Sequence, residues 1–388
     1  MKDRFELDRL VSDAQAATGL QDFGEPTWQE GLERLLPDFL GPAQLHDIGV
    51  EVVVADLTTY LTNRLQLVAW RASHPEVADV RVERPLVIVG QPRTGTTILY
   101  DLLAQDPRFR VPRSWEVDKP VPPPEAATYL TDPRIAEAQA QYDLVDTLIP
   151  GFATFHEVGA MLGQECVRIT AGDFRSMIFP TQYLTPTYND WLLREADLTP
   201  AYAWHKAYLQ HLGSRVTGEQ WLLKSPAHLW HLPDLAAAYP DAIVIQTHRD
   251  PLKVISSISA LTANLRRLAT DSATVAQAAQ QYVEDIPLGL DRCVRDRAAG
   301  VFAGQSVDVQ FSDFVADPLG RIARLYDEIG IERTAEAEQR QKAFLAAHPG
   351  DGGGNRYSFA DTGLRESDVR DRCAAYVEAF DVPLEPAR

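Results

Sequence analysis

The chain has 388 residues, of which 37 are Lys or Arg and 55 are Asp or Glu, so the formal net charge is −18. This charge argues against bulk binding to nucleic acid or to an anionic membrane, because both need a basic surface. With 45% hydrophobic and 24% charged residues, the composition is that of a folded globular protein. Any polyanion bound here must therefore meet a local cluster of positive charge.

The cysteines are sparse. Cys166, Cys293 and Cys373 are odd in number, widely separated and not at metal-ligand spacing, which argues against a disulfide framework or a zinc site and favours a reducing compartment. No apolar stretch reaches the length of a signal peptide at the N-terminus, or the roughly 18 residues of a membrane helix elsewhere. We predict a cytoplasmic protein without a transmembrane segment and without a nucleic-acid partner.

Residues 1–83 have helical patterns. Residues 27–30, Thr-Trp-Gln-Glu, have capping-box spacing, and a longer periodic segment covers about 48–70. Residues 85–89 then form a short apolar run that ends at Gly90, which is typical of a buried parallel strand.

Three further runs have the same character, at 220–223, 242–247 and 306–311. Helical patterns separate most of them, so the alternation predicts an α/β domain with a mainly parallel sheet. The mostly helical region 120–218 is interpreted as an insertion over one edge of the sheet and as an acceptor-binding lid.

The strongest motif is Gly90-Gln91-Pro92-Arg93-Thr94-Gly95-Thr96-Thr97, between the first strand and a helical pattern. Glycines let the backbone approach an anion, the helix N-terminus adds positive potential, and Thr96 and Thr97 supply hydroxyl donors. A standard P-loop would end in Gly-Lys-Ser/Thr, and no lysine stands there to hold a γ-phosphate. A glycine turn without a ligand is the alternative.

Two later strands also end on a cation. Lys224-Ser225-Pro226 and Arg249-Asp250-Pro251 both place a capping residue and a proline directly after it. Ser257 lies inside the helix that follows Arg249. The alternatives are a solvated surface lysine for Lys224 and a packing role for Ser257.

Ligands of open parallel sheets bind beyond the carboxyl ends of the strands. Arg93, Lys224 and Arg249 each lie at such an end, on a chain that is strongly acidic overall. The sequence therefore predicts a phosphate-rich nucleotide at this edge, bound by something other than a standard P-loop NTPase.

These motifs resemble those of the sulfotransferases that use 3′-phosphoadenosine 5′-phosphosulfate (PAPS). The segment 90–97 resembles the family's 5′-phosphosulfate loop, and Arg249 and Ser257, eight positions apart, resemble its 3′-phosphate site. The segment 308–314 is similar to a further landmark of the family. Residues around Glu116, Lys224 and 355–359 resemble the bacterial branch, in particular actinobacterial members, some of which sulfate hydroxylated lipids, including menaquinone-type quinones.

The resemblance implies a P-loop-like three-layer α/β fold with a mainly parallel central sheet, a helical N-terminal region and a helical insertion. We expect a single domain over 1–388. Its four parts would be the helical N-terminal region 1–83, the phosphosulfate loop and base at 84–119, the insertion 120–218, and the remaining sheet, 3′-phosphate site and C-terminal region at 219–388.

The resemblance also implies roles for residues. PAPS would be bound by the loop residues Arg93, Thr94, Gly95, Thr96 and Thr97, by Arg249 and Ser257, and by Arg356, whose alternative is an ordinary surface loop. Arg93 and Lys224 would stabilise the transferring sulfonate and the bridging oxygen. The product would be adenosine 3′,5′-bisphosphate, and no metal is required.

Two residues compete for the role of general base. The better-known cytosolic enzymes carry a histidine two residues after the lysine, where this chain has Pro226, which cannot take a proton. In branches with the present loop a glutamate about 20 residues beyond the loop arginine performs this task, and Glu116 lies 23 residues beyond Arg93. His228 is the competing candidate for the base. Its alternative is a structural role, in the cap of a helix or in core packing.

The expected acceptor is a small apolar molecule with a hydroxyl, preferably a hydroxylated lipid or a menaquinone-type quinone, with a small phenol or sugar hydroxyl next. A lipid acceptor would call for transient membrane contact. Aromatics of the insertion either line its channel or pack in the core: Phe152, Phe155, Phe174, Phe179, Tyr183, Tyr188, Trp191 and Trp204.

Two other functions stay open. A P-loop nucleotide kinase or NTPase would need the missing Gly-Lys-Ser/Thr. A non-catalytic nucleotide-binding module would not need the set Arg93, Glu116 and Lys224.

Overall fold

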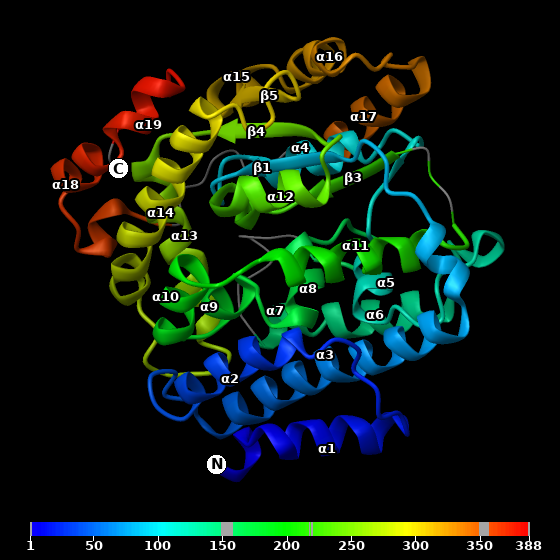
Figure 1. Cartoon of the computed structure of the whole chain (residues 1–388). Coiled ribbons are helices and arrows are strands. Elements are labelled where there is room, and N and C mark those ends of the chain that lie inside the picture. Colours follow the sequence, from blue (N-terminus) through cyan, green and yellow to red (C-terminus); the bar gives the residue numbers. More distant parts are fainter. Residues whose placement is uncertain (1, 149–157, 217, 219, 349–356, 387–388) are drawn as a thin grey trace. The chain divides into compact units, whose positions relative to one another are not determined.

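The computed structural model describes residues 2–148, 158–216, 218, 220–348 and 357–386. The chain forms two compact units (Figure 1). The first, here called the helical unit, comprises Met1–Val82, Pro112–Thr217 and Leu261–Ala273; the second, the sheet unit, comprises Glu83–Val111, Gly218–Ala260 and Thr274–Arg388. The single-domain organisation stays a prediction.

Parallel strands form the centre of the sheet unit. In the described ranges there are five, in the order β2-β3-β1-β4-β5. They are β1 (Leu86–Gly90), β2 (Phe109–Arg110), β3 (Gln220–Lys224), β4 (Ile243–His248) and β5 (Ser306–Gln310). The four predicted strands are confirmed; β2 was missed because two residues have no readable periodicity.

The register brings three strand ends together. In β1, Ile88 lies opposite Lys224 of β3, and Gly90 lies opposite Thr247 of β4. Because these strands are parallel neighbours, the residues that follow them emerge at the same edge of the sheet.

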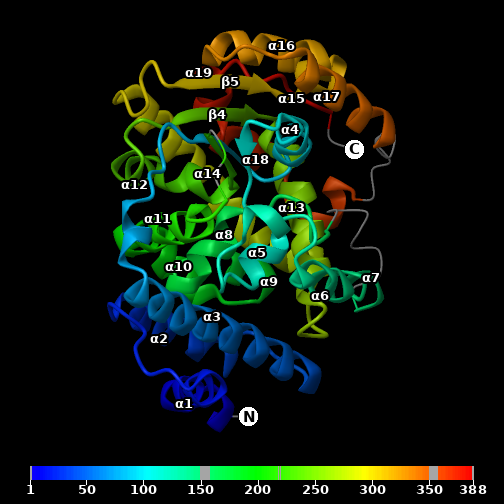
Figure 2. The same cartoon turned by 90° about the vertical axis from the view of Figure 1, so that its right-hand side faces the viewer.

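Helices cover both faces of the sheet. On one face, apolar strand residues such as Ile88, Leu222 and Ile245 pack with α4 (Thr96–Leu103), α15 (Phe311–Ala316) and α16 (Pro318–Ile329). On the other, the 3₁₀ helix η6 (Pro226–His231) packs against β1, and Gln246 donates to Cys293 of α14 (Val275–Ala298) at 3.1 Å. Figures 1 and 2 show these layers, and the predicted three-layer α/β fold is confirmed.

The other helices of the sheet unit lie around this core. They are α12 (Leu232–Ala238), the first part of α13 (Pro251–Arg266), α17 (Ala335–Ala347), η7 (Phe359–Thr362), α18 (Glu366–Arg372) and α19 (Ala374–Ala379).

The helical unit confirms the helical N-terminal region and the helical insertion. The long helix α3 (Asp47–Ser73) packs along α1 (Leu7–Thr18), as both views show, and α2 (Thr27–Phe39) packs against α10. The segment before the insertion supplies α5 (Ser114–Asp118). The insertion supplies α6 (Pro133–Tyr142), α7 (Val145–Leu148), α8 (Cys166–Thr170), α9 (Ile178–Gln182), α10 (Pro186–Arg194) and α11 (Thr199–Gly213).

The predicted capping box at residues 27–30 is wrong. Helix α2 begins at Thr27 itself, and no side chain caps its N-terminus. The Thr27 hydroxyl donates instead to Asp173 at 2.7 Å, and Glu30 accepts from Arg175 at 2.6 Å. Charge-assisted partners from distant segments outcompete the local cap because such hydrogen bonds are stronger.

No helix in these ranges is long and apolar enough to cross a bilayer. The three cysteines are free and buried.

Candidate active site

The loop between β1 and α4 is shaped by two glycines in left-handed backbone conformations. Gly90 has φ +139°, and a Cβ there would lie 2.3 Å from the Thr247 hydroxyl oxygen. Gly95 has φ +84°, and a Cβ there would lie 3.0 Å from the Phe311 ring. Both positions therefore require glycine, as expected of a loop built for close approach.

Arg93 is the centre of this loop. Its φ of +70° is a conformation that costs a non-glycine residue about 1 kcal/mol or more. Contacts with the next motif help to hold it: its Nε donates to the Ser257 hydroxyl at 3.0 Å, and its carbonyl accepts from Arg249 Nη1 at 2.9 Å. The structure thus brings Arg93, Arg249 and Ser257 together, although they belong to two separate sequence motifs.

Thr94 has a supporting role that the sequence did not reveal. Its hydroxyl donates to the Gln91 carbonyl at 2.6 Å and shares a 2.6 Å hydrogen bond with the Thr247 hydroxyl. The Thr94 side chain therefore fixes the loop to β4.

Arg249 already holds an anion that the chain itself supplies. Its Nε and Nη2 donate to the two carboxylate oxygens of Glu385 at 2.8 and 3.1 Å, while the guanidinium lies 4.1 Å from the Phe311 ring centre. A bidentate fork of this kind suits carboxylate and phosphate alike. Neither Glu385 nor Phe311 was predicted at this site.

Lys224 is buried, with 1% of its surface exposed, so the alternative of a solvated lysine is wrong. Its Nζ donates to the Thr97 hydroxyl at 3.3 Å and lies 5.6 Å from the Tyr100 ring centre, both on α4. The ammonium is thus placed at the helix that follows the loop.

The predicted caps after β3 and β4 are confirmed. The Ser225 hydroxyl accepts from the Ala227 N–H at 3.3 Å, and Asp250 accepts from the Leu252 N–H at 2.9 Å. The helix that Ser225 caps is 3₁₀ rather than α. His228 is its third residue and is buried, with 3% exposed.

Glu116, the other candidate base, belongs to the helical unit. It is fully buried on α5, and its Oε1 accepts from the Arg113 N–H at 2.7 Å and from the Tyr129 hydroxyl at 3.3 Å. The carboxylate thus also closes the N-terminus of its own helix. Both base assignments stay predictions, and Arg356 lies outside the described residues.

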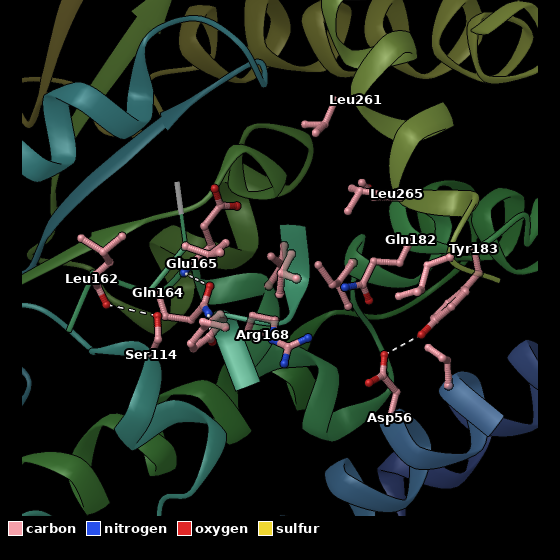
Figure 3. A pocket seen from close by; sticks show the side chains of 18 of the residues that line it. Asp56, Ser114, Leu162, Gln164, Glu165, Arg168, Gln182, Tyr183, Leu261 and Leu265 are labelled. Carbon is pink, nitrogen blue, oxygen red and sulfur yellow. Dashed lines mark hydrogen bonds between the residues drawn. The ribbon is translucent and has the colours of Figure 1, made fainter. Parts of the chain in front are cut away.

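A cavity of about 350 Å³ lies within the helical unit (Figure 3). Its wall is mostly apolar and includes Val52, Leu162, Val167, Ile178, Leu261 and Leu265. Ser114 also lines it, on the same short helix as Glu116. Such a size and lining are typical of small-molecule sites.

The aromatics of the insertion divide between cavity and core. Tyr183 lines the cavity. In contrast, the Phe179 ring contacts the rings of Phe174 and Tyr188 at 5.9 and 5.8 Å, and all three side chains are fully buried. Phe152 and Phe155 lie outside the described residues.

The polar residues of the cavity were missed because they belong to no sequence motif, and Asp56, Arg168 and Gln182 are among them. Asp56 accepts from the Tyr183 hydroxyl at 2.5 Å, and burial raises the pKa of its carboxyl. Arg168 pairs with Asp118 at 3.3 Å and lies over the Tyr60 ring. Gln182 also lines the cavity.

The placed residues show no grouping of three or more His, Cys, Asp or Glu side chains suited to a metal ion.

Several known proteins are similar to this chain. The crystal structure of sulfotransferase STF9 from Mycobacterium avium has a TM-score of 0.90 and 31% sequence identity, covering 98% of this chain and 97% of that one. Sulfotransferase STF1 from Mycobacterium tuberculosis H37Rv has a TM-score of 0.85 and 31% identity, covering 96% of this chain and 100% of that one.

A curated relative is omega-hydroxy-beta-dihydromenaquinone-9 sulfotransferase Stf3 from Mycobacterium bovis. It is 24% identical over 276 residues, which are 69% of this chain and 68% of the relative. The sequence profile described as "Sulfotransferase family" matches residues 85–336, which include the loop, the three cations at the strand ends and Ser257. The chain therefore belongs to the sulfotransferase family and is a sulfotransferase enzyme.

Proposed function

We propose that this sulfotransferase takes its sulfuryl group from PAPS and transfers it to a hydroxyl of a small apolar acceptor. The observation that carries the donor is the contact of Arg93 with both Ser257 and Arg249. This contact joins the loop after β1 to a second anion site, which follows the neighbouring strand β4. PAPS carries anionic groups at two separate positions, which suits two such sites.

In the proposed reaction the acceptor oxygen attacks the sulfur in line. An O–S bond to the acceptor forms while the bond from sulfur to the bridging oxygen breaks, which releases adenosine 3′,5′-bisphosphate. Arg93 and Lys224 would stabilise the negative charge that develops on the bridging oxygen. Glu116 would take the proton of the acceptor hydroxyl, with His228 as the competing base.

The favoured acceptor class is a hydroxylated lipid or a menaquinone-type quinone. The name of the curated relative supports this class, and so does the apolar cavity of the helical unit, which shares α5 with Glu116. A lipid acceptor would require transient contact of the enzyme with a membrane, and the proposed compartment is the cytoplasm.

The donor is tested by calorimetry with adenosine 3′,5′-bisphosphate and with ATP, each with and without magnesium. We expect the bisphosphate to bind without magnesium and more tightly than ATP. Arg249→Ala should weaken its binding by about 10- to 100-fold, because hydrogen bonds to charged groups are worth about 1.5–3 kcal/mol. The matched control is Arg365→Ala, at an exposed arginine of the same unit.

An unchanged affinity in the Arg249→Ala variant would contradict the 3′-phosphate site. Magnesium-dependent binding of ATP without binding of the bisphosphate would favour the kinase or NTPase alternative.

A further inference from the structure

The cavity of the helical unit has polar groups at two places. On one side are Ser114, Gln164 and Glu165, and on the other are Asp56, Gln182 and Tyr183, as Figure 3 shows. Most of the remaining wall is apolar, and the Arg168 guanidinium lies between the two polar groups. A purely apolar ligand would make no use of the second polar group, which consists of Asp56, Gln182 and Tyr183.

The second polar group is only partly satisfied by the protein. Asp56 accepts one hydrogen bond, from Tyr183, and makes no other among the residues that the structure places. The side-chain carbonyl of Gln182 is buried and has no hydrogen-bond partner within the same residues. Its side chain extends toward Arg168 across the cavity.

A buried carbonyl without a partner costs about 1–3 kcal/mol, so a ligand that donates a hydrogen bond there gains this amount. The charged groups that face Asp56 are Arg168 and Asp118. Arg168 is itself paired with Asp118, so Asp56 remains able to accept a further hydrogen bond.

We propose that the acceptor is bifunctional, with its reacting hydroxyl toward Ser114 and a second hydroxyl bound by Asp56 and Gln182. The proposal rests on the proposed function, because Ser114 shares its helix with the candidate base Glu116. A volume of about 350 Å³ corresponds to roughly a dozen water molecules at ~30 Å³ each, which suits an apolar body of similar heavy-atom number.

The test compares 1,8-octanediol with 1-octanol, which differ only in the second hydroxyl. With radiolabelled PAPS, kcat/KM of the full chain should be at least about 10-fold higher for the diol, since a polar site rejects an analogue that leaves it unpaired. Binding of both alcohols is measured independently by saturation-transfer NMR and should show the same order.

Gln182→Leu keeps the size of the side chain and removes its polar atoms. It should reduce the preference for the diol to about 3-fold or less, and Asp56→Leu, which removes both acceptor oxygens, provides a second variant should the first fail to fold. Asp190→Asn, at an exposed residue of α10, is the matched control and should keep the preference.

Three results would overturn the proposal. The two alcohols could bind and be sulfated equally, neither could bind, or the preference for the diol could survive in a folded Gln182→Leu variant. Equal sulfation would leave the proposed function intact. Diol-selective binding in a protein that does not bind adenosine 3′,5′-bisphosphate would overturn the proposed donor and support the bifunctional cavity.

Discussion

At the scale of single residues, Lys224 makes the sharpest distinction between binding and catalysis. It is buried, and its ammonium contacts Thr97 at the start of α4. If it stabilises the leaving oxygen, Lys224→Ala should lower kcat by about 100- to 1000-fold, with a much smaller change in the Kd for adenosine 3′,5′-bisphosphate.

Single-turnover kinetics and calorimetry measure these two quantities. Lys342→Ala, at an exposed lysine of α17, is the control. A loss confined to nucleotide affinity would reduce Lys224 to a binding residue.

The sequence predicted the cations of the site and two of their partners, Ser257 and Thr97, but not the partners from distant segments. Arg93, Lys224 and Arg249 stand beside strand ends, so local patterns were enough to find them. Glu385 lies 136 positions from Arg249, and Thr247 lies 153 positions from Thr94. Contacts over such separations depend on the fold and leave no local pattern.

At the scale of elements, predictions succeeded where a strand or helix had enough residues to show its period. The four strands of five or six residues were found, and the two-residue β2 was not. The cap of α2 failed for a different reason, because Asp173 and Arg175 take up the side chains that local spacing assigned to the cap.

The short helix α5 allows the two candidate bases to be separated. Glu116→Gln retains a side-chain oxygen that accepts from the Arg113 N–H, so the helix cap and the melting temperature should stay close to wild type. Turnover should nevertheless fall by about 100- to 10,000-fold, the usual contribution of general base catalysis.

His228→Ala, assayed beside it by sulfate transfer and thermal melting, should retain most of the turnover. The opposite pattern, with activity retained in Glu116→Gln and lost in a folded His228→Ala, would move the role of base to His228.

At the scale of the whole molecule, two buried histidines of α11 should make the protein sensitive to mild acid. Burial lowers the pKa of His205 to about 3, and burial outweighs a hydrogen bond to the Pro120 carbonyl in lowering that of His211 to about 4. Their folded pKa values lie below the unfolded value near 6.5, so the unfolded state takes up protons first as pH falls. Stability is therefore lost as pH falls from about 6.5 to about 4 for His211 and to about 3 for His205.

At pH 5 each histidine should cost roughly 2 kcal/mol of unfolding free energy relative to pH 8. Urea unfolding at the two pH values measures this loss. His211→Gln removes one titrating group, so the difference between the two pH values should shrink by about that amount. An unchanged difference would show that His211 does not carry this effect.

The whole-molecule charge was a poor guide to the site. A net charge of −18 describes the surface as a whole, whereas Arg93, Lys224 and Arg249 concentrate positive charge at one edge of one sheet. The predicted boundaries at 83/84 and 218/219 fall within one residue of crossings between the two units, whereas the crossing at 260/261 lies inside α13 and leaves no break in the sequence pattern.

The pairing of Arg249 with Glu385 has a consequence for the effect of salt on donor binding. A phosphate that binds this guanidinium displaces a carboxylate tethered to the same chain rather than mobile ions from solution. Ionic strength weakens both the Arg249–Glu385 pair before binding and the Arg249–phosphate pair after binding, so the two effects on affinity partly cancel. Donor affinity should therefore fall less steeply with salt than the charge of the nucleotide suggests, and Glu385→Gln should restore the steeper dependence.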